Sequence, residues 1–182
     1  IDIHAGGEDM IFPHHENEIA QSEACNGKEF SRYWMHNAFL NIDNKKMSKS
    51  LGNFFTVREI SEKYDLQVLR FFMLSAHYRS PLNFSAELME ASKNGLDRII
   101  TAADLLKRLA GNGEGELTEA EEALLREAKT YVQKFEEAMD DDFNTADAIS
   151  AIFELVKFSN IHAADAHSQR FFAALREELV TL

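Results

Sequence analysis

The sequence predicts two kinds of architecture in succession, α/β first and all-α afterwards, with helix predominating overall. Up to about Asn83, short apolar segments alternate with Gly, Asn and Asp, which is typical of strands and helices joined by tight loops. After Pro81 the chain contains no proline, and its apolar residues recur at three- and four-residue steps. That pattern favours an antiparallel helical bundle.

The first part is predicted to form a strand–helix–strand unit. Ile1 and Ile3 fit the end of a strand, and Pro13 suits the first position of a helix running from about residue 13 to 24. The segment NAFLNI, residues 37–42, is then a second strand. In such folds ligands bind at the loop that follows a strand, here the glycine-containing loop after Ile3.

Helices are predicted for most of the remaining chain. Residues 56–78 contain two helical segments, the first opened by a capping box of Thr56 and Glu59, and a second capping box, Thr118 with Glu121, opens a later helix. Between them, a long helix presents one face at helical spacing: Leu88, Ser92, Leu96, Ile99, Ala103, Leu106 and Ala110. The acidic run at 140–142 precedes a further helix, and we expect it to cap that helix rather than bind a cation.

Composition excludes several classes of protein. The chain has 182 residues, 45% of them hydrophobic, and no apolar run approaches the roughly 20 residues that span a bilayer. Its single cysteine cannot form an internal disulfide, so a reducing compartment is expected. The net charge of −12 is uneven, because residues 28–79 carry nine basic and five acidic side chains. A local surface could therefore meet phosphates, although a basic solvated face explains the same counts.

The stretch FPHHENEIAQSEAC raises the question of a metal site. His14 and Glu18 are four residues apart and so share one helix face, and both are ordinary zinc ligands. Cys25 lies seven residues beyond Glu18, roughly 10 Å along the axis, and cannot share an ion with that pair in a straight helix. Taken alone, the pair is better explained as a polar helix face than as a metal site.

A lysine-rich loop, KKMSKSLGN, follows the second predicted strand. Lys45, Lys46 and Lys49 stand beside hydroxyls and a glycine, which suits phosphate oxygens whose negative charge grows as a phosphorus bond breaks. A solvated basic loop has the same composition.

Four blocks of sequence resemble one family, the cysteinyl-tRNA synthetases of class I. The blocks are DIHAGGEDMIFPHHENEIAQSEAC, YWMHNAFLNIDNKKMSKSLGNFFTVRE, LRFFMLSAHYRSPLNFS and MDDDFNTADAISAIFELVK. The resemblance implies the C-terminal part of a Rossmann-like catalytic domain at 1–52 and a connecting, stem-contact-like helical segment at 53–84. It implies a tRNA-binding, DALR-like helical bundle at 85–182, and we expect the chain to lack the N-terminal half of the catalytic domain and the end of the bundle.

The resemblance also implies a reaction. Members of the family activate L-cysteine with ATP and Mg²⁺ to cysteinyl-adenylate and transfer the cysteinyl group to the 3′ end of tRNA(Cys). Lys46 and Lys49 match the catalytic lysines of the signature loop, and Lys49 matches the one assigned to ATP. Gly7 and Asp9 match the nucleotide-binding segment of related enzymes, and His4 beside it is a weaker candidate.

In the same family His14 and Glu18 match two ligands of a Zn²⁺ ion that recognises the thiolate of cysteine, completed by two cysteines from earlier in the chain. We therefore expect the 182 residues alone to be inactive and to hold zinc weakly. Tyr78 and Arg79 are candidates for tRNA contact. The resemblance further implies a cytoplasmic, monomeric enzyme with no membrane partner.

Two alternatives stay open. The cysteine-adenylating ligase of mycothiol biosynthesis, which joins cysteine to a glucosaminyl-inositol, shares the adenylation half of this architecture. A non-catalytic helical binding module would make the lysine loop incidental. Charging of tRNA by the full gene product separates both from the synthetase.

Overall fold

The computed structural model confirms the predicted fold class, an α/β part together with a helical bundle. The residues that the structure describes are 1–42, 45–48, 52 and 55–182. The chain forms two compact units, which are described separately. The α/β unit comprises Ile1–Lys63 and Ala76–Ala86, and the helical unit comprises Tyr64–Ser75 and Glu87–Leu182.

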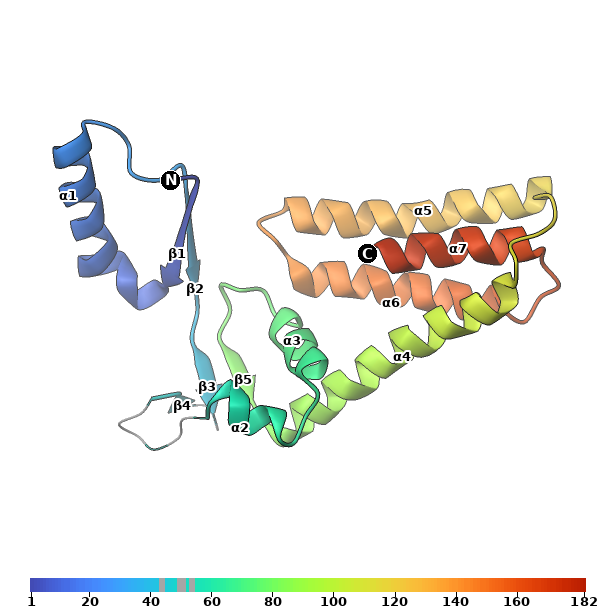
Figure 1. Cartoon of the computed structure of the whole chain (residues 1–182), viewed down its shortest axis with the longest axis horizontal. Helices are drawn as coiled ribbons and strands as arrows, with labels where there is room; N and C mark the ends of the chain where they lie inside the picture. The colour runs from blue at the N-terminus through green and yellow to red at the C-terminus, as the bar shows by residue number, and fades with distance from the viewer. Residues whose placement is uncertain (43–44, 49–51, 53–54) are drawn as a thin grey trace. The chain divides into compact units, whose positions relative to one another are not determined.

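The α/β unit begins with the predicted strand–helix–strand arrangement (Figure 1). Its elements in chain order are β1 (Ile3–Gly7), the short helical turns η1 (Glu8–Met10) and η2 (Ile11–His15), α1 (Glu16–Asn26), β2 (Tyr33–Asn37), β3 (Leu40–Ile42), β4 (Lys45–Lys46), α2 (Val57–Ser61) and β5 (Leu82–Phe84). Strands β1 and β2 pair in parallel, with His4 opposite Trp34 and Gly6 opposite His36. Because side chains alternate along a strand, these four residues share one face of the sheet.

Two boundaries differ from the sequence prediction. The regular α-helix begins at Glu16, whereas Pro13, His14 and His15 belong to the helical turn η2 that leads into it. Phe12, just before Pro13, has extended backbone angles (φ −134°, ψ 133°). A residue that precedes proline is sterically biased toward this region. The predicted strand at 37–42 is divided between β2 and β3, which belong to different sheets.

The second sheet of the α/β unit has the strand order β4-β3-β5. Strand β3 pairs antiparallel with β4 and parallel with β5. We had not expected a strand at β5, since its three residues give no periodic signal. Its pairing brings the segment that follows Arg79 alongside the strand that precedes the lysine loop.

The helical unit contains the predicted bundle. Its helices are α3 (Leu66–Leu74), α4 (Ala86–Ala110, whose first residue belongs to the α/β unit), α5 (Glu119–Asp140), α6 (Thr145–His162) and α7 (Gln169–Thr181). Helices α5, α6 and α7 pack side by side (Figure 1). The capping boxes Thr56–Glu59 and Thr118–Glu121 are both confirmed. Among the described residues, no helix is both long and apolar enough to cross a membrane.

One buried cluster of α4, α5, α6 and α7 side chains forms the core of the bundle. Its members are Ala102, Leu106, Ala110, Ala128, Leu155, Val156, Phe158, Phe171, Phe172, Leu175 and Leu179. The predicted face of α4 is buried at Ser92, Leu106 and Ala110, whereas Leu88 is exposed and Met89 is buried beside it. The residue that caps α6 is Asn144, whose side chain accepts a hydrogen bond from the Asp147 N–H, and it follows the acidic run at 140–142. Asp140 ends α5.

Candidate functional site

The loop at the end of β1 brings together two residues assigned to ATP, Gly7 and Asp9, and the lysine assigned to catalysis, Lys46. Gly7 ends the strand, and a Cβ atom at this position would lie 2.6 Å from Asp9 Oδ1, so any other residue would require the Asp9 carboxylate to shift. Lys46 Nζ donates a hydrogen bond to Asp9 Oδ2 at 3.1 Å. Its ammonium group also lies 3.5 Å from the centre of the Phe39 ring, a cation–π contact. A carboxylate and an ammonium group, both about half exposed, therefore face solvent at this edge.

The lysine loop is described only in part. Lys45 and Lys46 form β4, and Lys46 is placed as above. Lys49, the lysine matched to ATP, lies outside the described residues. The catalytic assignments of Lys46 and Lys49 stay predictions.

The predicted metal-binding pair is brought together where η2 leads into α1, with His14 in η2 and Glu18 in α1. His14 Nε2 lies 3.7 Å from Glu18 Oε1, in the spacing expected of positions four apart on a helix. The other oxygen, Glu18 Oε2, is 2.7 Å from His4 Nε2. His4 is only a weak ATP candidate by sequence, yet the structure places it against the metal candidate Glu18, where it fixes the orientation of the carboxylate.

A layer of aromatic rings supports this pair. The His4 ring lies 4.9 Å from the rings of both His15 and Trp34, and the Trp34 and His36 rings are stacked within 10° of parallel. His15 is 3% exposed, and its Nδ1 is 2.8 Å from His36 Nε2. A Cβ atom on Gly6 would come within 2.8 Å of the His15 ring, so glycine is required for the ring to lie on the strand.

The electrostatics keep His15, the buried ring of this layer, neutral. Burial lowers the pKa of His15, and the neighbouring His36 and His4 lower it further. At neutral pH the His15 imidazole is therefore uncharged, and its contact with His36 is a hydrogen bond between one N–H donor and one lone pair. Rings packed in this way can hold the metal-binding candidates His14 and Glu18 rigidly, and an uncharged His15 does not repel a cation.

The geometry fits a zinc ion at His14 and Glu18. Zinc bonds of about 2.0–2.1 Å at a tetrahedral angle place ligand atoms roughly 3.3 Å apart, close to the 3.7 Å between His14 Nε2 and Glu18 Oε1. His4, His15 and Glu18 also offer ligand atoms within 4.8 Å of one another. Cys25 is exposed near the far end of α1 and belongs to neither of the two candidate ligand groups found among the described residues.

The two candidates for tRNA contact lie in the turn before β5. Arg79 Nε donates a hydrogen bond to the Tyr78 hydroxyl at 3.0 Å, and the Tyr78 ring stacks on His77. The Tyr78 carbonyl accepts a hydrogen bond from the Ala38 N–H, which ties this turn to the end of β2. Their role in binding RNA stays a prediction.

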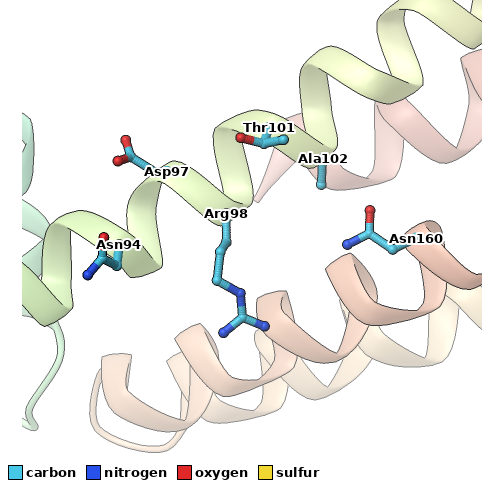
Figure 2. Close-up of a pocket in the computed structure, with 6 residues that line it drawn as sticks. All are labelled: Asn94, Asp97, Arg98, Thr101, Ala102 and Asn160. Atoms are coloured by element: carbon cyan, nitrogen blue, oxygen red, sulfur yellow. The ribbon is translucent and has the colours of Figure 1, made fainter.

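A hollow of about 380 Å³ lies between α4 and α6 in the helical unit (Figure 2). It is lined by Asn94, Asp97, Arg98, Thr101, Ala102 and Asn160. Arg98 extends toward α6, and its guanidinium carbon lies 5.2 Å from the centre of the Phe153 ring. The formal charges of Asp97 and Arg98 cancel, so the lining does not favour an anion such as phosphate.

Sequence reasoning missed the supporting layer of His15, Trp34 and His36. The available signal was the strand alternation WMH in β2, which places Trp34 and His36 on one face. The parallel register places Trp34 and His36 beside His4 and Gly6 on the same face of the sheet. This register depends on pairing between distant segments, and no local sequence pattern indicates it.

The chain thus contains a parallel strand–helix–strand unit and a helical bundle, as the resemblance to class I tRNA synthetases implies. The family model described as "tRNA synthetases class I (C) catalytic domain" matches residues 1–94, and the model described as "DALR domain" matches residues 134–182. The first match covers more than half of the chain, so the chain belongs to the class I tRNA synthetases of the (C) type.

Curated relatives agree with this assignment and confirm the resemblance read from the sequence. A cysteine–tRNA ligase of Lachnospira eligens is 66% identical over 183 aligned positions, covering 100% of this chain and 39% of the relative. A cysteine–tRNA ligase of Lachnoclostridium phytofermentans is 60% identical, covering 100% of this chain and 40% of the relative. The chain thus spans about two fifths of the length of these relatives.

Two solved structures share the fold. The LeuRS of Agrobacterium radiobacter K84, solved as a ternary complex with tRNA and LeuAMS, has a TM-score of 0.79 at 18% identity and covers 97% of this chain and 24% of that one. The methionyl-tRNA synthetase of Mycobacterium tuberculosis, in complex with methionyl-adenylate, has a TM-score of 0.68 at 22% identity, covering 98% of this chain and 38% of that one. At these identities the likeness concerns the fold alone.

Proposed function

We propose that these residues serve a cysteine–tRNA ligase, which activates L-cysteine with ATP and transfers it to tRNA(Cys) in the cytoplasm. The observation that supports the proposal most directly is the hydrogen bond of 3.1 Å from Lys46 Nζ to Asp9 Oδ2, beside the end of β1. Ligands of open α/β sheets bind at this edge. The identity of 66% to a cysteine–tRNA ligase supports the same reaction.

Each residue has a distinct role in this proposal. Gly7 lets the nucleotide approach the backbone, and the Asp9 carboxylate accepts hydrogen bonds from the ribose hydroxyls. Lys46 and Lys49 neutralise the charge that develops on pyrophosphate as the cysteine carboxylate attacks the α-phosphorus. Mg²⁺ would accompany the ATP phosphates.

Zinc would be held by His14 and Glu18 together with ligands from outside these 182 residues. When bound, it supplies a soft Lewis acid that prefers the thiolate of cysteine to the hydroxyl of serine. His4 orients Glu18, and the hydrogen-bonded pair of His15 and His36 supports these metal-binding residues. Cys25 has no part in this site.

The helical unit would bind tRNA, and Tyr78 and Arg79 of the α/β unit would place the acceptor stem. Binding of tRNA to the helical unit would depend on shape and hydrogen bonding more than on net charge, because residues 85–182 carry ten basic and twenty acidic side chains. We therefore expect the phosphate contacts to come mainly from the basic segment at 28–79.

The test uses the full-length protein that contains these residues. Cysteine-dependent exchange of pyrophosphate into ATP measures activation, and acceptance of cysteine by tRNA(Cys) measures transfer. Both activities are expected, and Lys46→Ala should lower exchange by about 100-fold, whereas Lys45→Ala should stay close to wild type. Activation without tRNA charging, but with transfer to a glucosaminyl-inositol, would instead identify the mycothiol-type ligase. Absence of both activities would leave the helical binding module.

A further inference from the structure

The turn between α6 and α7 gathers two histidines and an aspartate within six residues. His162 ends α6, and Asp165 and His167 follow it in the segment HAADAH. His162 Nδ1 lies 3.5 Å from Asp165 Oδ2, and His167 Nε2 lies 3.9 Å from the same oxygen. The three residues offer ligand atoms that all fall within 4.8 Å of one another.

The two imidazole nitrogens are buried without a hydrogen-bond partner. Neither His162 Nδ1 nor His167 Nε2 makes a hydrogen bond to another described group. The side chains are 20% and 15% exposed, and aromatic rings enclose them, with Phe158 4.5 Å from the His162 ring and Phe171 4.4 Å from the His167 ring. A bound water or ion commonly accounts for buried polar atoms that have no hydrogen-bond partner in the protein.

A carboxylate on α5 orients one of the rings. Glu121 Oε1 lies 3.6 Å from His167 Nδ1, on the opposite side of the ring from Asp165. An anionic oxygen at this position favours the tautomer with hydrogen on Nδ1, which leaves the lone pair of Nε2 directed at Asp165. Carboxylates in this outer position commonly fix the tautomer of histidines that bind metals.

We propose that His162, Asp165 and His167 form a binding site for a divalent transition-metal ion, with zinc as the best match. The separations of 3.5 and 3.9 Å are close to the roughly 3.3 Å between ligand atoms of a tetrahedral zinc ion with bonds of about 2.0–2.1 Å. Two imidazoles and one carboxylate are a normal zinc donor set, and water takes the fourth position. The ion would stabilise the turn between α6 and α7. The contact of His167 with Glu121 would link this turn to α5.

This site is separate from the pair His14 and Glu18 and does not depend on the proposed function. The test therefore starts from the 182-residue chain carrying His14→Ala and Glu18→Gln, which removes the ligands of the other site. Zinc chloride is titrated calorimetrically at pH 7.5, and retained zinc is measured by elemental analysis after gel filtration. This background protein should bind about one zinc ion per chain.

Three further variants in that background assign the ligands. His162→Gln with His167→Gln should abolish the binding, and Asp165→Asn should weaken it by about tenfold or more. The matched control, Asp104→Asn, removes an exposed carboxylate from α4 in the same unit and should bind zinc unchanged. Asp165 is itself exposed, so its variant is expected to fold, which far-ultraviolet circular dichroism checks.

A second measurement replaces zinc by Co²⁺, whose four-coordinate complexes absorb visible light strongly. The absorption should appear in the background protein and disappear in the double histidine variant. The proposal is overturned if the background protein retains no zinc and develops no cobalt absorption. It is equally overturned if the folded double histidine variant binds zinc as the background protein does.

Discussion

Lys46 Nζ and Asp9 Oδ2 lie 3.1 Å apart although 37 positions separate them in the sequence. The ion pair joins the lysine loop to the loop after β1, the two segments that the family resemblance assigns to ATP. Because both side chains are about half exposed, the pair contributes only about 0.2–1 kcal/mol to stability. Breaking so weak an ion pair costs little free energy. In the proposed function, nucleotide binding would replace it with contacts from Asp9 to the ribose and from Lys46 to the phosphates.

The first prediction separates catalysis from stability at this pair. In the full-length protein, Lys46→Ala should lower cysteine-dependent pyrophosphate exchange by about 100-fold, while its free energy of unfolding changes by less than about 1 kcal/mol. Exchange kinetics and denaturant melts measure the two quantities. If exchange and stability fell together, Lys46 would be a structural residue.

The second prediction concerns Glu18. In the full-length protein, Glu18→Gln should lower zinc affinity by about tenfold or more and raise the KM for cysteine, because the amide loses the anionic charge that binds both the metal and His4. Elemental analysis and exchange kinetics check this. Glu16→Gln is the control, since it removes an exposed carboxylate from the same helix. Equal zinc loss in both variants would contradict the assignment.

The third prediction concerns Arg79. Arg79→Ala in the full-length protein should reduce tRNA charging roughly tenfold, equivalent to about 1.4 kcal/mol, and leave pyrophosphate exchange nearly unchanged. The reason is that the side chain lies on an exposed turn, held by the Tyr78 hydroxyl, and is assigned to the RNA and not to the adenylate. An equal loss in both assays would count against a contact with tRNA.

The fourth prediction uses the pKa of Glu121. Burial raises the pKa of this carboxyl, but hydrogen bonds from the backbone N–H groups of Thr118 and Ser168 and from the Thr118 hydroxyl outweigh burial and lower the pKa to about 2. Since the folded value lies below the ordinary 4.5, the stabilisation is complete above about pH 4.5 and is lost as the pH falls toward 2.

Glu121→Gln should therefore cost about 2 kcal/mol at pH 7, with the difference from wild type shrinking between pH 4.5 and 2. Urea melts of the 182-residue chain at several pH values, in the presence of a chelator, measure this. The neighbouring Glu122→Gln serves as the control, since that exposed carboxylate makes only a 3.9 Å ion pair with Arg126. A difference that stays constant down to pH 2 would refute the role of ionisation.

Sequence reasoning succeeded where the determining interactions are local. The capping boxes at Thr56 and Thr118 depend on residues three apart, and the His14–Glu18 pair depends on one helical turn. The contact of His4 with Glu18 depends on how β1 lies against α1, and strand β5 depends on pairing with β3 some forty positions away. No local pattern records either of these.

The cluster of His162, Asp165 and His167 in the turn after α6 was not identified from the sequence, for a different reason. Its spacing, histidine, aspartate and histidine at positions 162, 165 and 167, was visible in the sequence. What could not be read there is the burial of both ring nitrogens and the approach of Glu121 from α5, which distinguish a ligand cluster from an ordinary polar turn.

The aromatic layer beside the metal pair also provides a built-in optical probe. Trp34 is the single tryptophan of the chain, and the rings of His4 and His15 lie 4.9 and 5.2 Å from it, with His36 stacked alongside. Indole fluorescence responds to the protonation and polarisation of neighbouring imidazoles. Tryptophan emission from the unlabelled 182-residue chain thus reports on the surroundings of the metal pair, and a metal titration can be followed there without a reporter group.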